Sequence, residues 1–391
     1  MSAAADALTR GERIQRGPSI DGPALLLALS LLLLGLTMVT SASITIAGRD
    51  GEPFGYLERQ LLLVLIGGVA AAVTFAIPTE TLEQLALPLL LLGVLLLLLV
   101  LVPGLGHVVN GSRRWLHLAG MNFQVSEAAR VLALIYIAHY CVRFETSLRS
   151  GAGGLIKALA LLVVLGALLL AEPDLGAATV LFVTGFGLLF LAGAQMRWVL
   201  AAVLGASGAM WALVMFSDYR MRRVTGFLDP WADPYNTGFQ LTQSLIAIGR
   251  GQWFGVGLGA SVQKLFYLPE AHNDFLFAVL AEELGLAGVL LTMGLFLAFA
   301  WRVFALARRA HSLNLKFHAY LACGFGLWLL VQAFVNIGVN MGVLPTKGLT
   351  LPLMSYGRSS MLVALAWLGL ILRVHHEVTG GARGAARRVS A

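Results

Sequence analysis

The sequence predicts an all-α polytopic membrane protein, and its composition and its apolar runs carry that prediction. The chain has 391 residues, 58% of them apolar and only 12% charged, with a mean hydropathy of +0.83. Soluble domains are nearer half apolar and one quarter charged. The apolar residues gather into runs that can cross a bilayer, which takes about 20 residues each. Because unpaired strand edges cannot lie in lipid, these runs are expected to be helices.

Ten such runs predict ten transmembrane helices. They cover approximately residues 24–46, 60–77, 84–103, 126–142, 155–171, 175–194, 197–216, 274–301, 318–344 and 351–374. Very short turns join the fifth, sixth and seventh runs, so these three are expected to be antiparallel neighbours. The first run is longer than the core of a signal peptide and is expected to be an uncleaved span.

The chain is therefore divided into two tails and one membrane domain. Residues 1–23 are predicted to form an N-terminal tail, residues 24–375 the membrane domain and residues 376–391 a basic C-terminal tail. Residues 217–273 form one large loop between the seventh and eighth helices. Because this loop is short and has no cysteine pair, it is expected to lie on the membrane bundle and not to fold alone.

The Lys and Arg residues predict that both tails are cytoplasmic. In that orientation more than half of the 27 cations lie in cytoplasmic loops and tails, as the positive-inside rule requires. The outer loops nevertheless carry Arg113, Arg114, Arg220, Arg222, Arg223, Arg250 and Lys264. Two interpretations stay open for these outer cations: contact with anionic lipid headgroups, or binding of an anionic substrate group such as a phosphate.

The large loop contains three kinds of sequence. Residues 229–238 are rich in turn formers and predict an ordered irregular chain. Apolar and polar residues then alternate over 239–248, which predicts one short amphipathic helix. The glycine-rich run 249–259 either cradles a phosphate with its backbone N–H groups or allows close packing on a helix. It is not a dinucleotide-binding fingerprint, since no strand precedes it.

Three carboxylates lie at or inside the eighth run. Asp274 opens this run, and either Asn273 or Asp274 suits the N-cap of a helix. A carboxylate there is also partly removed from water, so it can serve as a general base. Glu282 and Glu283 lie deeper, where ionisable groups are costly and indicate function. The alternative is a buried polar contact to another helix, for example to the asparagines of the ninth run.

Several stretches together resemble the SEDS family (shape, elongation, division and sporulation). They are residues 234–259, 268–275, 344–348 and 355–357, together with the outer-loop motif at 110–115. The likeness covers the ten runs and is closer to the family's division member than to its elongation member. Four residues depart from the family pattern, namely Val125, Arg130, Asn273 and Arg358, which stand in place of Pro, Lys, Thr and Gly. The bulk of Arg358 leaves open how the chain near Lys347 packs.

The resemblance implies a peptidoglycan glycosyltransferase that polymerises lipid II into glycan strands during septal wall synthesis and cell division. It implies Asp274 as the catalytic carboxylate, which takes the proton of the acceptor sugar's 4-hydroxyl. The residues expected to bind substrate are Arg113, Arg114, Arg130, Lys347, His272 and Ser355. A divalent cation, Mg²⁺ or Mn²⁺, is expected as cofactor, with no ligands assigned.

The resemblance also implies partners and a location. The protein is expected to cross the bacterial cytoplasmic (inner) membrane many times, at the division septum. Its expected partners are lipid II, membrane lipid, a class B penicillin-binding transpeptidase and other division proteins, but not nucleic acid. Two other classes were weighed. A lipid II flippase would share the cations but line a path at the bilayer midplane. A scaffold that only recruits a partner would not explain Asp274.

Overall fold

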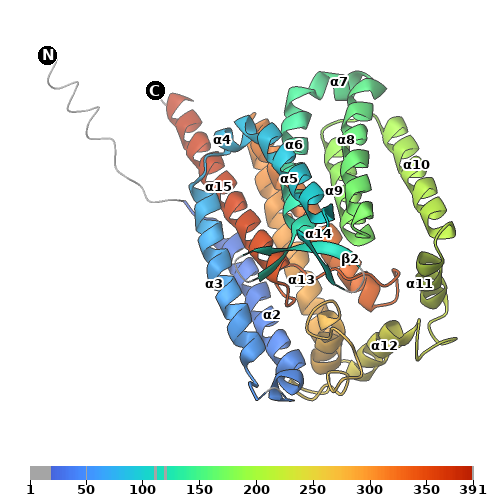
Figure 1. The fold of residues 1–391 in the computed structure, drawn as a ribbon. Helices are drawn as coiled ribbons and strands as arrows, with labels where there is room; N and C mark the ends of the chain where they lie inside the picture. Colours follow the sequence, from blue (N-terminus) through green and yellow to red (C-terminus); the bar gives the residue numbers. More distant parts are fainter. Residues whose placement is uncertain (1–18, 50, 110–111, 119–120, 390–391) are drawn as a thin grey trace, which may run out of the picture.

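The computed structural model describes residues 19–49, 51–109, 112–118 and 121–389, and these form a helical bundle with one small sheet (Figure 1). The helices are α2 (Gly22–Arg49), α3 (Gly55–Ala76), α4 (Thr79–Gln84), α5 (Ala86–Leu101), α6 (Val125–Arg143), α7 (Glu145–Ser150), α8 (Ala152–Ala171), α9 (Leu175–Leu191), α10 (Met196–Met215), α11 (Asp218–Leu228), α12 (Phe239–Gly251), α13 (Leu276–Ser312), α14 (Lys316–Asn340) and α15 (Arg358–Val389). The strands are β1 (Gly106–Val109), β2 (Ser112–Leu118) and β3 (Met121–Gln124).

Every predicted apolar run contains a helix. Within the described residues, seven helices are long and apolar enough to cross a membrane, namely α2, α3, α6, α8, α13, α14 and the part of α15 from Arg358 to Gly380. Three shorter apolar helices, α5, α9 and α10, occupy the other predicted runs. The chain is a polytopic helical membrane protein, as its composition predicts. The last helix begins at Arg358, later than predicted, because residues 351–357 form an irregular segment.

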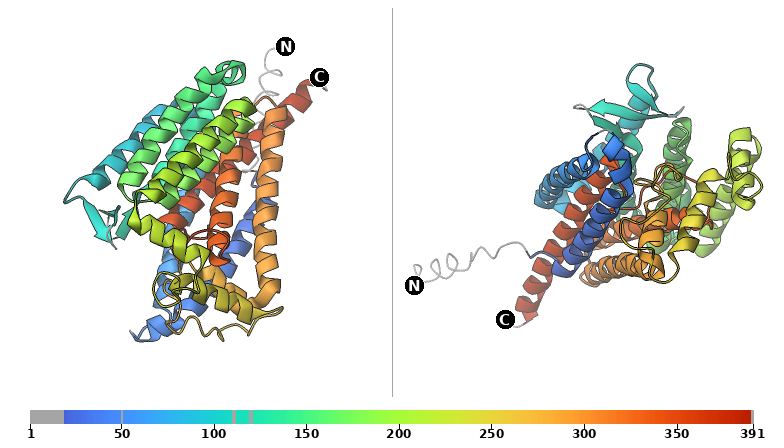
Figure 2. Two further views of the ribbon diagram at one scale, coloured as in Figure 1. Left: turned by 90° about the vertical axis from the view of Figure 1, so that its right-hand side faces the viewer. Right: turned by 90° about the horizontal axis from the view of Figure 1, so that it is seen from below.

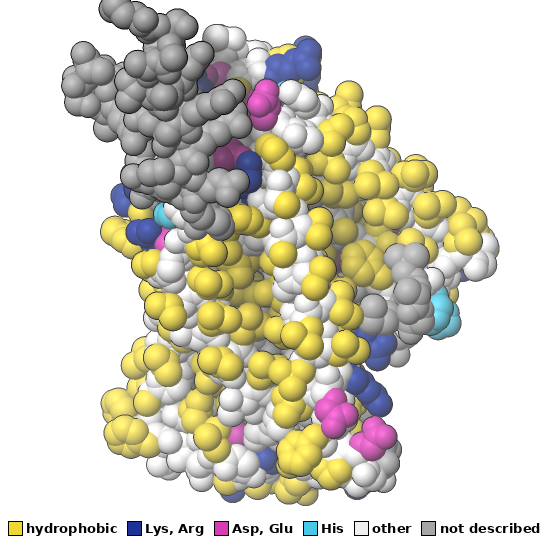
Figure 3. Space-filling model, turned by 90° about the vertical axis from the view of Figure 1, so that its left-hand side faces the viewer, with side chains coloured by type: hydrophobic (Ala, Val, Ile, Leu, Met, Phe, Trp, Pro, Cys, Tyr) yellow, Lys and Arg dark blue, Asp and Glu magenta, His cyan; other side chains and the backbone are white. Residues whose placement is uncertain are grey.

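The outer surface of the bundle is apolar, as a lipid-facing surface should be. Leu33, Leu65 and Leu91 are each more than half exposed. On the face drawn in Figure 3, apolar side chains cover the middle of the molecule and charged side chains lie mainly toward its two ends. Such a wide apolar surface is unfavourable in water and favourable in hydrocarbon.

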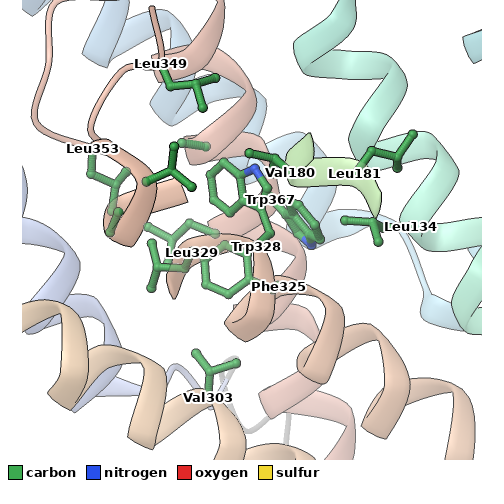
Figure 4. Packing of buried hydrophobic residues seen from close by; sticks show 14 of the residues in the cluster. Leu134, Val180, Leu181, Val303, Phe325, Trp328, Leu329, Leu349, Leu353 and Trp367 are labelled. Atoms are coloured by element: carbon green, nitrogen blue, oxygen red, sulfur yellow. The ribbon is translucent and has the colours of Figure 1, made fainter. Parts of the chain in front are cut away.

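The centre of the bundle is an aromatic cluster that joins α14 to α15 (Figure 4). The rings of Trp328 and Trp367 have centroids 5.0 Å apart, and Phe325 lies edge-on to Trp367 at 5.3 Å. All three side chains are fully buried. Offset and edge-to-face pairs of this kind stabilise a core beyond the area that they bury.

Both described ends of the chain lie at the same end of the bundle. The backbone N–H of Ser19 donates to Nδ1 of His376 (3.1 Å), and Asp21 accepts a hydrogen bond from Nε of Arg302 (3.0 Å). Helices α4 and α7 lie at this end, whereas α12 and the loop before α13 lie at the opposite end (Figure 1). The expected C-terminal tail is helical through Val389 as a continuation of α15.

Several elements of the structure were not predicted, namely the small sheet and helices α4, α7 and α11. Strands β1, β2 and β3 form an antiparallel sheet between α5 and α6, outside the apolar runs, so their backbone groups pair without entering the lipid-facing surface. Helix α11 precedes the irregular segment of the large loop, whereas the amphipathic α12 confirms the helix predicted there. Residues 110 and 111 of the outer-loop motif and residues 1–18 of the N-terminal tail lie outside the described residues.

Candidate active site

Two asparagines of α14 hold the backbone of Asp274 just before α13. Nδ2 of Asn336 and Nδ2 of Asn340 both donate to the carbonyl oxygen of Asp274, at 2.9 and 3.0 Å. Asn336 also donates to the carbonyl oxygen of Leu349 (2.6 Å), so one amide joins Asp274 to the segment that follows α14. Because the two asparagines are four residues apart, they lie on one face of their helix. The position of Asp274 is therefore set by its main chain.

The hydrogen bonds that the described residues make to Asp274 go to its backbone carbonyl oxygen and not to its carboxylate. Phe275 is the N-cap of α13 and no side chain caps this helix, so the prediction that Asn273 or Asp274 is the cap is wrong. Burial and, to a smaller extent, Glu270 raise the pKa of Asp274 and Arg114 lowers it, with the net result a pKa of about 7. A carboxylate that titrates near neutral pH and is free of structural bonds is suited to accept a proton.

Gly348 lies directly against this carboxylate. A Cβ atom at position 348 would stand 2.7 Å from Oδ2 of Asp274, so a side chain there would displace the carboxylate. The preceding residue, Lys347, donates from Nζ to Oγ1 of Thr179 on α9 (3.1 Å). The segment between α14 and α15 thus brings a glycine to Asp274, and the cation that precedes it binds α9.

His272 is held beside the site by aromatic rings. Its ring packs edge-to-face on Tyr56, with centroids 4.8 Å apart, and 5.6 Å from Tyr356, whose backbone N–H donates to the carbonyl of His272 (3.0 Å). Burial lowers the pKa of His272 more than Glu270 raises it, which favours the neutral imidazole. Its Nδ1 atom is buried without a hydrogen-bond partner in the described part of the chain. A neutral imidazole so placed can bond a sugar hydroxyl.

Arg113 and Arg114 are neighbours on β2 and contact opposite sides of the strand, as strand geometry requires. Nε of Arg114 donates to the carbonyl oxygen of Glu172 in the turn between α8 and α9 (3.0 Å), and its side chain also lowers the pKa of Asp274. Nη1 of Arg113 donates to the carbonyl oxygen of Leu101 at the end of α5 (3.1 Å). Of these two predicted cations, the structure brings Arg114 to Asp274.

Arg130 is part of the buried frame of the site. It is 1% exposed, forms an ion pair with Glu127 and donates from Nη1 to Oε1 of Gln332 (3.3 Å). Gln332 in turn donates to the carbonyl oxygen of Thr350 (3.1 Å), so Arg130 supports the segment that carries Lys347. Direct contact of Arg130 with substrate stays a prediction.

Ser355 is also buried, and its hydroxyl oxygen accepts a hydrogen bond from the backbone N–H of Leu351 (2.9 Å). This bond stabilises the irregular segment before α15, and substrate binding by Ser355 stays a prediction. Arg358 is exposed at the first residue of α15. Its bulk therefore takes no space from the chain around Lys347.

Glu282 and Glu283 bind the large loop and α2, not the asparagines of α14. Glu282 accepts a hydrogen bond from Arg250 (2.9 Å), whereas Glu283 accepts hydrogen bonds from Lys264 (3.1 Å) and Ser41 (2.7 Å). Both carboxylates are fully buried. The expected asparagine partner is wrong, and two of the unexplained outer cations serve to neutralise these carboxylates.

The glycine-rich run 249–259 packs on a break in α13. Gly285 has φ 64° and ψ −161°, a conformation that essentially only glycine adopts, and it divides α13 into two parts. The backbone N–H groups of Val256 and Gly257 donate to the carbonyl oxygens of Glu282 and Glu283, at 3.0 and 3.1 Å. These groups are therefore engaged by the helix, and the structure supports packing over a phosphate cradle.

An apolar groove of about 1140 Å³ lies between α8, α9 and α10. Helices α8 and α9 pack on one another as antiparallel neighbours, whereas α10 and α11 stand at one edge of the bundle, opposite α2 and α3 (Figure 2). Val163, Phe182 and Val203 line the groove. Thr179, which binds Lys347, also lines it, so the groove extends to the candidate site.

These features define a polytopic membrane protein with a titratable carboxylate and cations at one end of its bundle, next to an apolar groove. A family profile described as "Cell cycle protein", which represents FtsW, RodA and SpoVE, matches residues 23–380. The chain belongs to this family.

Individual relatives and solved structures agree with this assignment. Proteins named "Probable peptidoglycan glycosyltransferase FtsW" are 53% identical in Thioalkalivibrio sulfidiphilus (95% of this chain, 96% of the relative) and 50% identical in Halorhodospira halophila (98% of each). A structure titled "Structural coordination of polymerization and crosslinking by a peptidoglycan synthase complex" has a TM-score of 0.76 at 31% identity, over 92% of this chain and 98% of that one. RodA of Thermus thermophilus has a TM-score of 0.66 at 30% identity, over 92% and 97%. The predicted likeness to the division member is confirmed.

Sequence reasoning missed several residues that shape the site. Asn336 and Asn340 were expected only as polar residues of an apolar run and as contacts for the two glutamates, although their spacing of four already placed both on one helix face. Gly348 limits the position of the Asp274 carboxylate, and Glu270 raises its pKa. Both effects depend on closeness in the folded chain, which the surrounding sequence does not reveal. Glu172 also lay outside the predicted site.

Proposed function

We propose that the protein is a peptidoglycan glycosyltransferase that polymerises lipid II into glycan strands for septal wall synthesis. The observation that carries this proposal is the unbonded carboxylate of Asp274, fixed through its backbone by Asn336 and Asn340. The names of relatives that match almost the whole chain support the same activity.

In the proposed mechanism Asp274 is the general base. The ionised carboxylate takes the proton of the acceptor's 4-hydroxyl while that oxygen bonds to the anomeric carbon of the donor. The bond from the anomeric carbon to the polyprenyl pyrophosphate breaks in the same displacement, so the anomeric centre inverts. The leaving group carries the negative charge away, and the side chains of Arg114 and Lys347 stabilise it. His272 orients a sugar hydroxyl.

The apolar groove between α8, α9 and α10 is proposed to hold a polyprenyl chain. Its lining is apolar, and its volume of about 1140 Å³ suits a long hydrocarbon. Because Thr179 belongs both to the groove and to the Lys347 hydrogen bond, a chain in the groove would place its pyrophosphate near that cation. The polyprenyl chain and its pyrophosphate would then bind to adjacent surfaces of the protein.

The expected divalent cation stays a proposal. The described residues contain no group of three or more His, Cys, Asp or Glu side chains that could hold a metal ion. Mg²⁺ often binds through substrate phosphates and only one or two carboxylates. We therefore propose that Mg²⁺ or Mn²⁺ arrives with the substrate's pyrophosphate, where it would neutralise charge, and we assign it no protein ligands.

The full topology and the partners also belong to this proposal. We propose ten spans in the bacterial inner membrane, both tails in the cytoplasm and the loop 217–273 outside. Attachment of Ser19 to His376 supports an even number of crossings. A class B penicillin-binding transpeptidase and other division proteins are the proposed partners at the septum. The synthase complex among the similar structures, whose title names polymerization and crosslinking, supports the transpeptidase.

The flippase alternative finds less support. Glu282 and Glu283 are the carboxylates at membrane depth that a flippase path would use, but both are buried and bound by Arg250, Lys264 and Ser41. Carboxylates so engaged attach a loop to a helix. They do not line a path for a polar headgroup.

Substitution of Asp274 tests the proposed function. Purified parent and Asp274→Asn proteins, each with the transpeptidase partner and a divalent cation, are given labelled lipid II, and polymer is resolved on a gel. Loss of the base should lower the rate by about a hundredfold or more. Partner binding and melting temperature show that the variant is folded. Polymerisation by Asp274→Asn at the parent's rate would remove Asp274 from the mechanism, and lipid II crossing vesicles without polymer would favour the flippase.

A further inference from the structure

Glu172 is a buried carboxyl group that the proposed mechanism does not use. It is the C-cap of α8, in the short turn that leads to α9, and its side chain is fully buried. Neither of its carboxyl oxygens has a hydrogen-bond partner within the described residues. A charge in such a place lacks both water and bonded donors, so the neutral acid is the form that the site accepts.

Arg114 links this turn to the candidate base. Its Nε donates to the carbonyl oxygen of Glu172 (3.0 Å), and another of its nitrogens donates to that of Pro173. Nη1 lies 3.9 Å from Oδ1 of Asp174. The same guanidinium lowers the pKa of Asp274. The guanidinium of Arg114 therefore binds the turn and also contributes positive charge at the site where the substrate's pyrophosphate would lie.

The two carboxyl groups of the turn, those of Glu172 and Asp174, differ in their hydrogen bonds. Asp174 accepts hydrogen bonds from the backbone N–H of Ala177 (3.0 Å) and from the hydroxyl of Ser126 (3.0 Å). Glu172 receives none. The other charged groups around the turn are the Glu127–Arg130 pair on α6 and Lys347, which is bound to α9.

We propose that Glu172 acts as a neutral acid that leaves the charge of Arg114 available to the substrate's pyrophosphate. Glu172 is then a positioning residue that favours an anionic substrate, and this inference rests on the proposed function. Burial and Asp174 raise the pKa of Glu172 and Arg114 lowers it in part, with the net result a pKa of about 8. Above that pH an ionised Glu172 would offset the charge of Arg114 and repel the pyrophosphate.

Binding of lipid II at two pH values tests this role. Full-length protein in nanodiscs is titrated with lipid II at pH 7 and pH 9. Every protein tested carries Asp274→Asn, which prevents turnover and removes the titration of Asp274. The sugar-linked pyrophosphate keeps its charge over this range. For the protein that keeps Glu172, we expect the Kd for lipid II to be about tenfold higher at pH 9 than at pH 7. A tenfold change is the scale of one charged hydrogen bond. With Glu172→Gln the Kd should match at pH 7 and change less than threefold at pH 9.

The controls separate this role from simple packing. Glu58→Gln, at an exposed carboxylate on α3, should keep the tenfold change. Arg114→Gln should bind weakly at both pH values, and its pH dependence should shrink. An unchanged pH dependence in Glu172→Gln, or weak binding by that variant at pH 7 with a normal melting temperature, would overturn the proposal. A protein that shows the expected pH dependence but never polymerises lipid II would overturn the proposed activity while retaining the role of Glu172.

Discussion

Gly348 and Asp274 are so close that a single methyl group on the glycine would lie 2.7 Å from the Oδ2 atom of the carboxylate. The two residues come from segments more than seventy positions apart, which Asn336 joins by bonding the carbonyl oxygens of Asp274 and Leu349. The side-chain position of the proposed base is therefore set by a glycine, and its backbone position by asparagines.

Gly348→Ala should displace the carboxylate of Asp274 without changing any titratable group. A displacement of about 1 Å at a reacting group lowers the rate by about a hundredfold, so polymerisation should fall by about that factor. The check is the polymerisation rate at saturating lipid II. Gly68→Ala on α3, where a Cβ atom meets nothing within 4 Å, is the matched control. A rate for Gly348→Ala equal to that of the control would contradict the assigned contact.

The polymerisation rate should depend on the ionisation of Asp274. Burial raises the pKa of this carboxyl to about 7, and only the ionised form accepts a proton. In a Glu172→Gln background, where position 172 does not titrate, the value of kcat/KM should therefore rise with pH up to about 7 and then level off. The residual activity of Asp274→Asn should lack this rise. Persistence of the same rise in that variant would assign it to another group.

Asp274 should also make the protein less stable as pH increases. Its folded-state pKa lies above its ordinary value, so the folded protein holds a proton that the unfolded chain has released. This contribution to stability is present at low pH and is lost as pH rises through about 7. Asp274→Asn should thus raise the melting temperature more at pH 8 than at pH 5. An equal effect at both pH values would be evidence against a raised pKa.

Lys264 should stabilise the attachment of the large loop to α13. Its Nζ donates to Glu283, and both side chains are buried. Lys264→Met would leave the carboxylate uncompensated, which typically costs about 3–5 kcal/mol. The double variant Lys264→Met/Glu283→Gln should recover much of this loss. Melting temperatures of the purified proteins give the comparison, and a double variant no more stable than Lys264→Met would argue against the pair.

The proposed topology places Ser312 at the cytoplasmic side and Tyr235 outside. With Cys141 and Cys323 replaced by serine, single cysteines at 312 and 235 are treated with a membrane-impermeant thiol reagent in spheroplasts. Tyr235 is 85% exposed, so Tyr235→Cys should be labelled. Ser312→Cys should react only after lysis, and its labelling in intact spheroplasts would reverse the orientation.

The helices were predictable because each is a long run of apolar residues, a signal that depends on the lipid and not on tertiary contacts. The sheet formed by β1, β2 and β3 was not, because its strands are short and only pairing across the sheet stabilises them. The break at Gly285 was also hidden. It forms because the backbone of run 249–259 replaces helical hydrogen bonds, and that contact joins segments distant in sequence.

The site was predicted in part, for similar reasons. Asp274, His272 and Lys347 belong to polar stretches at the ends of apolar runs, where an unexplained charge is easily noticed. The sequence could not separate Arg114 from Arg113, because only the strand geometry shows which of the two faces Asp274. Nor could it show that Glu172 lacks a partner, since that depends on the burial of a whole turn.

The glycine-rich run 249–259 has a consequence for sequence variation in relatives and in engineered forms. Its place on α13 is fixed by main-chain N–H and carbonyl groups, which every residue except proline supplies. Side chains at the exposed positions Trp253 and Phe254 can therefore be exchanged freely as far as this contact is concerned. Insertion or deletion of one residue would shift every later donor past its acceptor. Tolerance at this segment should be high for substitutions at Trp253 and Phe254 and very low for changes in length. It should also be low at Gly251 and Gly255, where a Cβ atom would lie 1.9 and 2.1 Å from backbone oxygens of α13.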